Sequence, residues 1–72
     1  MTYDNMVSEL QTISHPEVWE QISYYIKKAK CLRDNHEIKR AKDSMEDAIA
    51  VTESLDEYYL ASQIQKYLKY FK

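Results

Sequence analysis

Apolar residues recur at helical spacing in four segments of the chain, and short polar breaks separate these segments. Within each segment the apolar positions follow an i, i+3, i+4, i+7 pattern, which places them on one face of an α-helix. The pattern predicts helices over residues 2–13, 17–34, 36–53 and 55–71. The side chains expected to share one core are Tyr3, Met6, Val7, Leu10, Ile13, Val18, Ile22, Tyr25, Ile26, Ala29, Leu32, Ile38, Ala41, Met45, Ala48, Ile49, Thr52, Leu60, Ile64, Tyr67, Leu68 and Phe71.

The polar breaks contain residues that typically begin a helix. Thr2 is expected to cap the first helix, and Asp34 or Asn35 can cap the third. Ser54 and Glu57 have the spacing of a capping box, in which each side chain bonds the backbone N–H of the other residue. This pair predicts that the fourth helix begins directly after Ser54.

The composition favours helices and argues against a sheet. The chain has no Gly and one Pro, whereas hairpin turns and left-handed helix caps usually require Gly. We therefore expect an all-α fold, a small bundle of three to four antiparallel helices joined as helical hairpins, with no sheet. Seventy-two residues form a single domain, 1–72, and a partner chain would help so small a core to stay folded.

The single cysteine, Cys31, cannot form an internal disulfide, which favours a reducing compartment. No apolar run approaches the ~20 residues of a membrane span. The N-terminus also lacks the basic-then-apolar pattern of a signal peptide. These features predict a cytoplasmic protein that does not use a membrane.

Charged residues are strongly segregated along the chain. Residues 27–42 hold seven of the ten basic side chains, and residues 43–57 hold six of the twelve acidic ones and no basic one. Helix dipoles favour acids near the N-terminus and bases near the C-terminus, and the second and fourth predicted helices follow this rule. The third helix reverses it, with its bases early and its acids late. We therefore expect the third helix to carry a functional surface.

Tyrosine is unusually abundant, with seven residues that include the doublets at 24–25 and 58–59. Adjacent residues on a helix point about 100° apart, so each doublet is expected to send one ring inward and one outward. Exposed Tyr rings are favoured in interfaces, although they can also cover the rim of a core. The residues expected to bind a partner are Tyr24, Arg33, Lys39, Arg40, Lys42, Asp43, Glu46, Asp47, Tyr58 and Tyr59.

Small and large residues alternate through the middle of the chain in a spaced pattern. The small positions are Ala29, Ala41 and Ala48, and the large positions are Tyr25, Leu32 and Met45. This spacing resembles one tetratricopeptide repeat over residues 25–53, a helix–turn–helix unit of about 34 residues. Lys28 and Glu53 depart from the motif, which prefers Leu and Pro there, and its typical glycines are absent. The resemblance implies a protein-binding scaffold without catalysis.

Signals for catalysis are weak. A zinc site needs about four ligands, and Cys31 and His36 are the only close pair of Cys and His residues. The acid pairs 46–47 and 56–57 are sequence neighbours that point in different directions on a helix, so they do not form an acid–base pair. A Gly-rich phosphate loop cannot exist in a chain without Gly. We expect no enzyme activity, no metal and no cofactor.

Three functions agree with these features. The leading interpretation is a non-enzymatic protein–protein interaction module, such as a small adaptor, inhibitor or regulator. It would bind a protein partner through its charge-polarised surface and exposed Tyr side chains. One alternative is a nucleic-acid-binding helix-turn-helix protein that uses the basic segment 27–42. The other is a self-assembling helical protein, that is, a homo-oligomer.

Overall fold

The structure, a computed structural model, describes residues 3–69 and 71. Over these residues it contains four helices and no strand, which confirms the predicted all-α fold without a sheet. The helices are α1 (Tyr3–Ile13), α2 (Pro16–Asp34), α3 (Ile38–Ser54) and α4 (Tyr58–Leu68).

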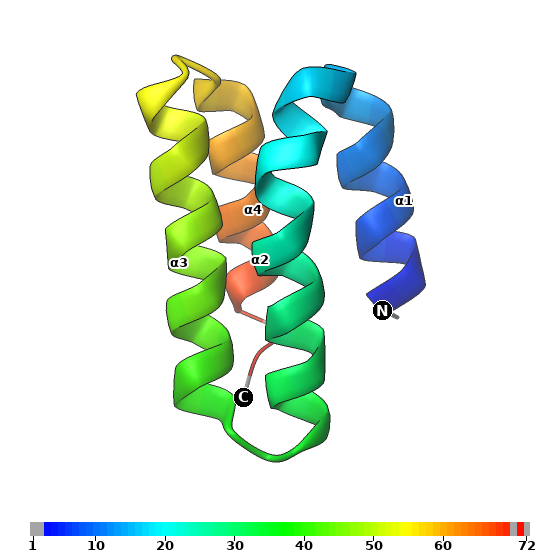
Figure 1. Cartoon of the computed structure of the whole chain (residues 1–72), viewed down its shortest axis with the longest axis vertical. Coiled ribbons are helices and arrows are strands. Elements are labelled where there is room, and N and C mark those ends of the chain that lie inside the picture. Colours follow the sequence, from blue (N-terminus) through cyan, green and yellow to red (C-terminus); the bar gives the residue numbers. More distant parts are fainter. Residues whose placement is uncertain (1–2, 70, 72) are drawn as a thin grey trace.

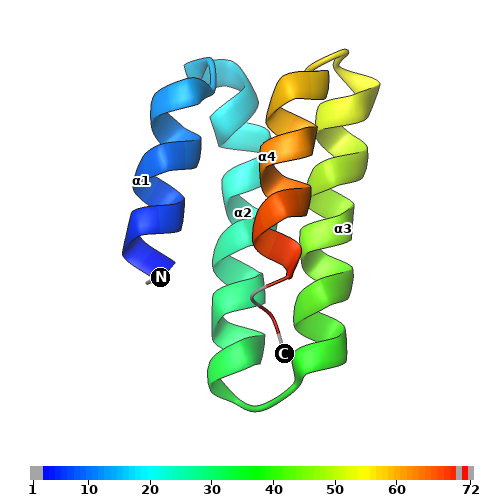
Figure 2. The same cartoon turned by 180° about the vertical axis from the view of Figure 1, so that it is seen from behind.

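The four helices pack around one core. Each helix contacts its neighbours in the chain, α1 also contacts α4, and the most extensive contact is between α2 and α3. The corner at 35–37 lies at one end of the long axis, and the breaks at 14–15 and 55–57 lie at the other (Figure 1). Seen from behind, α4 lies between α1 and α3 (Figure 2). The radius of gyration is 11.0 Å, close to the ~11 Å expected for a compact chain of this length.

The core consists mainly of the predicted apolar stripes, with Ala61 as a further buried residue that the pattern did not include. Ile22, Met45 and Ile64 are fully buried, as their positions on the inward faces require. Ile13 differs from the prediction, because it is the last residue of α1 and its side chain is 37% exposed. The expected core residues that are only half-buried, at the margin of the core, are Val7, Tyr25, Leu32, Ile38, Ile49 and Leu68.

The corners after α2 and α3 share one backbone conformation. His36 and Asp56 both adopt left-handed backbone angles, with φ values of 63° and 59°. In each corner the following residue donates its backbone N–H to a carbonyl five residues earlier, at 2.8 Å. This bond defines a Schellman motif, which usually contains Gly at the left-handed position. The chain therefore builds left-handed caps without Gly, contrary to the expectation from composition.

The predicted capping box at the start of α4 is wrong. Ser54 is the last residue of α3, and its hydroxyl donates to the carbonyl of Val51 at 2.7 Å. Glu57 is the N-cap residue of α4 and makes no side-chain capping bond. Because the Schellman corner occupies the residues between the two helices, α4 begins at Tyr58 instead of directly after Ser54.

The predicted caps of α3 are also wrong, for the same reason. Asp34 is the last residue of α2, Asn35 is its C-cap, and His36 takes the left-handed position. Glu37 is the N-cap residue of α3 and makes no side-chain capping bond. The corner thus delays α3 by two residues relative to the prediction. Thr2 and the side chain of Tyr3 lie outside the described part of the chain.

Candidate protein-interaction surface

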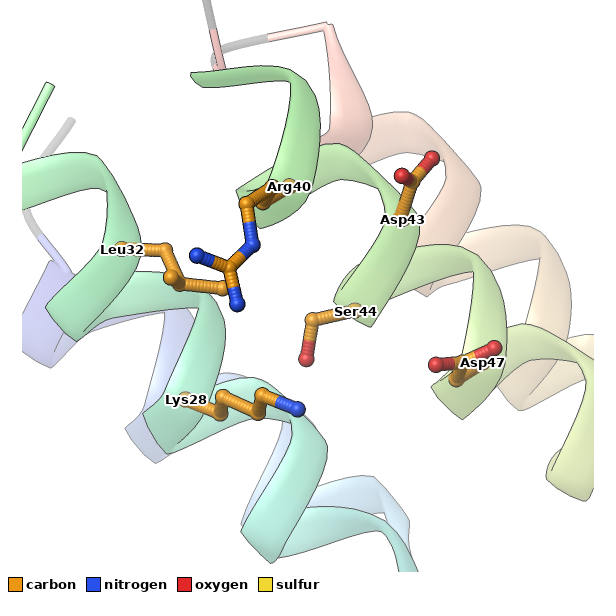
Figure 3. A pocket seen from close by; sticks show the side chains of 6 residues that line it. All are labelled: Lys28, Leu32, Arg40, Asp43, Ser44 and Asp47. Atoms are coloured by element: carbon orange, nitrogen blue, oxygen red, sulfur yellow. The ribbon is translucent and has the colours of Figure 1, made fainter. Parts of the chain in front are cut away.

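The outer face of α2 and α3 contains a hollow of about 120 Å³. The two lining residues on α2 lie four positions apart. Those on α3 lie three, four and seven positions after the first of them, Arg40, so each helix presents one face to the hollow. We call this site the α2–α3 hollow (Figure 3). It is lined by Lys28, Leu32, Arg40, Asp43, Ser44 and Asp47.

Ser44 forms the floor of the α2–α3 hollow and joins the two helices. Its side chain is 3% exposed, and its hydroxyl donates to the backbone carbonyl of Tyr25 at 2.7 Å. The same two helices also contain three fully buried alanines, Ala29, Ala41 and Ala48. Small side chains at such positions let helix backbones approach closely, which leaves the longer flanking side chains standing around a shallow floor.

The charges of the α2–α3 hollow are separated between its two sides. Figure 3 shows Lys28 and the guanidinium of Arg40 towards α2, with Asp43 and Asp47 on the α3 side. Arg40 forms an exposed ion pair with Glu37, with Nη1 and Oε1 2.7 Å apart. Within the part of the chain that the structure describes, neither aspartate makes an ion pair or a hydrogen bond. Both carboxylates are therefore available to a partner.

An exposed aromatic ring continues this surface. Tyr24 is 62% exposed, and its ring packs edge-on against Tyr25, with centroids 5.4 Å apart. The ammonium of Lys28 lies 5.9 Å from the Tyr24 ring centroid, within the range of a cation–π contact. We use the name α2–α3 face for the α2–α3 hollow together with Tyr24. This face combines both charge signs with a rigid amphipathic side chain.

The second tyrosine doublet lies away from the α2–α3 face. Tyr58 and Tyr59 are both exposed, which corrects the expectation that one ring would point inward. The reason is that α4 begins only at Tyr58, so both rings precede Leu60, the first buried residue of the helix. The Tyr58 hydroxyl donates to the Asp56 carboxylate at 3.1 Å. Figure 1 places the start of α4 at the end of the molecule opposite the corner at 35–37.

The other predicted partner-binding residues are exposed but do not join the α2–α3 face. The guanidinium of Arg33 lies 5.7 Å from the ring centroid of Phe71. Lys42 lines a second hollow, of about 330 Å³, between α3 and α4. Lys39 and Glu46 line neither hollow. Of the predicted set, the structure thus brings together Arg40, Asp43 and Asp47, and Tyr24 contacts Lys28 of the same hollow.

Three members of this surface were not among the predicted partner-binding residues: Lys28, Ser44 and Leu32, the last of which was expected in the core. Lys28 was a departure from the repeat motif, yet it lies four residues from both Tyr24 and Leu32 and so belongs to their face. Ser44 had a readable signal, because it lies three residues after Ala41 and four before Ala48. A small polar residue at that spacing indicates a close helix contact with a hydrogen bond.

The structure supplies little for other kinds of site. Among the described residues, no group of three or more His, Cys, Asp or Glu side chains is placed to hold a metal ion. Cys31 is a free, exposed thiol. None of the described helices has the length and apolar character needed to cross a bilayer. Comparison of the chain with protein-family models, curated proteins and solved structures finds no match.

Proposed function

We propose that this protein is a non-enzymatic protein–protein interaction module that binds its partner on the α2–α3 face. The observation that carries the proposal is the pair of unpartnered carboxylates, Asp43 and Asp47, on the side of the hollow opposite Lys28, whose ammonium contacts the exposed ring of Tyr24. Charge pairs of this kind select a partner and orient it, and an exposed Tyr provides contact area with a polar tip. A small adaptor, inhibitor or regulator needs these properties.

The same face argues for a protein partner over a nucleic acid. Arg40 belongs to the basic segment that would contact phosphates, but it shares its face with Asp43 and Asp47. Carboxylates on that face would repel the phosphate backbone, which supplies most of the affinity in nucleic-acid binding. A protein surface can instead offer both charge signs and satisfy both sides of the α2–α3 hollow.

The proposal also includes several finer features. It takes successive helices to run antiparallel and residues 25–53 to act as a tetratricopeptide-like helix pair in a binding scaffold. It assigns the protein no catalytic step and no cofactor. It places the protein in the cytoplasm, where the exposed thiol of Cys31 would remain reduced.

Capture of a partner from cell lysate at low and high salt tests this proposal. Asp43→Lys/Asp47→Lys should reduce capture at least about tenfold, since it removes the charges that orient the partner. The matched control is Glu46→Lys/Glu53→Lys, which makes the same charge change on exposed residues of α3 that lie outside the α2–α3 hollow. Equal losses in both variants, or no loss in either, would overturn the proposed face.

The aromatic part of the face has its own comparison. Tyr24→Ala should weaken capture, whereas Tyr58→Ala should leave it unchanged, because only Tyr24 adjoins the α2–α3 hollow. The opposite ranking would place binding at the start of α4 and contradict the proposal.

A further inference from the structure

We infer that the partner on the α2–α3 face is a second copy of this chain. The two copies are related by a two-fold axis that runs between α2 and α3, parallel to the axes of these helices. The inference rests on the proposed function, because it names the occupant of the same face. Its basis is that the face is complementary to itself: the basic groups lie over α2 and the free carboxylates lie over α3 (Figure 3).

The charge separation selects one orientation for the second copy. When two identical faces meet, the two-fold axis that relates them lies in the plane of contact. An axis in this plane that is perpendicular to the helix axes would place α2 of one copy on α2 of the other and bring basic groups onto basic groups. An axis parallel to the helix axes places α2 of each copy over α3 of the other, so that basic groups meet carboxylates in both halves of the interface.

The Ser44–Tyr25 hydrogen bond identifies which charges meet. It places these two residues at the same height along the helix pair. From that height, Lys28 lies about 4.5 Å and Asp43 about 1.5 Å towards the corner at 35–37, at 1.5 Å of rise per residue. The remaining offset of about 3 Å is within reach of a flexible Lys side chain. The dimer therefore contains two equivalent Lys28–Asp43 pairs.

The size of the face limits the strength of this dimer. The molecule measures 31 × 21 Å along its two longer axes, which limits the footprint to about 650 Å² per copy. Even this upper limit, about 1,300 Å² for the two copies together, lies at the lower end of stable protein interfaces. Self-association should therefore be reversible and sensitive to salt, since exposed charge pairs are screened by ions.

Analytical ultracentrifugation between about 10 μM and about 1 mM tests the inference. The wild-type protein should form a dimer, and Lys28→Glu and Asp43→Lys should each weaken it at least about tenfold, because each puts like charges together twice. A one-to-one mixture of the two variants should dimerise as strongly as the wild type, since both contacts again join opposite charges. Combining both changes in one chain should have the same effect.

The controls are Lys39→Glu and Glu46→Lys, which change exposed charges that line neither hollow and should not alter the dimer. Circular dichroism of every variant verifies that the helices remain folded. A wild-type protein that stays monomeric throughout, or a mixture no stronger than its single variants, overturns the inference. If the wild-type protein is monomeric but captures a different protein from lysate, and Asp43→Lys/Asp47→Lys reduces that capture, the proposed docking function stands and only the second copy is excluded. If that change has no effect on capture either, both are overturned.

Discussion

His36 and Asp56 hold equivalent left-handed positions in the two Schellman corners, with φ values of 63° and 59°. An L-residue in this conformation brings its Cβ close to the following carbonyl oxygen, at a cost of roughly 1–2 kcal/mol that Gly avoids. Asp tolerates the conformation better than most residues, because its short polar side chain can bond locally. The two corners therefore have the same backbone conformation, but its energetic cost is expected to be smaller at Asp56 than at His36.

His36→Gly should raise the free energy of unfolding by about 1 kcal/mol, and Asp56→Gly by less. Urea denaturation followed by circular dichroism measures both values. The control is Asn35→Gly, where φ is −91° and the added freedom of Gly should lower stability instead. A His36→Gly protein as unstable as Asn35→Gly would contradict the strain assigned to this corner.

The capping errors show where local sequence patterns stop being decisive. Ser54 and Glu57 fit a capping box, but the same residues also fit the end of one helix and the N-cap of the next. The alternative wins because the Schellman corner bonds the last carbonyls of α3, which a capping box leaves open. The apolar stripes, in contrast, predicted the helices themselves, because each stripe has to be buried wherever the helix ends.

The candidate site was less predictable than the fold. The pattern identified Tyr24, Arg40, Asp43 and Asp47 as exposed, but exposure alone does not show which side chains share a face. That depends on the register of α2 against α3, which the Ser44–Tyr25 bond describes and which joins residues nineteen positions apart. Sequence spacing within one helix cannot supply such a contact between two helices.

Ser44→Ala should lower the free energy of unfolding by about 1 kcal/mol, because it leaves the Tyr25 carbonyl without its hydroxyl donor. Ser44→Leu should cost more, about 1–3 kcal/mol, since a larger side chain forces α2 and α3 apart. Ser54→Ala is the control, because the hydroxyl of that exposed residue bonds only within its own helix. Thermal denaturation of the three variants checks the order. A Ser44→Leu protein as stable as the wild type would show that the two helices do not need a small residue there.

The buried hydroxyl of Tyr67 donates to the Glu9 carboxylate and so links α4 to α1. Tyr67→Phe should lower the free energy of unfolding by about 1 kcal/mol, because the ring still fills the core but the bond is lost. Tyr58→Phe is the matched control, since its exposed hydroxyl also bonds a carboxylate and its loss should have almost no effect. Equal effects of the two substitutions on urea denaturation would contradict a structural role for the α1–α4 link.

Ile22→Ala should destabilise the fold by about 2–5 kcal/mol, because it leaves a cavity in the fully buried core. Ile13→Ala removes the same atoms from a half-open site at the end of α1, so its cost should stay below about 1 kcal/mol. Chemical denaturation compares the pair. A cost at Ile13 that matched the cost at Ile22 would mean that α1 ends inside the core.

The last prediction tests whether the reversed order of charges in α3 stabilises the fold. Lys39 lies in the first turn of α3, where the helix dipole favours an acid, and that turn contains no acidic residue. Lys39→Glu should therefore leave the melting temperature unchanged or raise it slightly. Lys66→Glu, in the last turn of α4, should lower it, because the dipole favours a base there.

The loss of stability in Lys66→Glu should be about 0.3–1 kcal/mol at low salt, the gain in Lys39→Glu should not exceed that amount, and both effects should shrink as salt is added. Differential scanning calorimetry at two salt concentrations measures both, with the wild type as reference. If Lys39→Glu proved the more destabilising of the two, the lysine would have a stabilising contact of its own. The reversed charge order of α3 would then belong to folding and would offer no support for a functional surface.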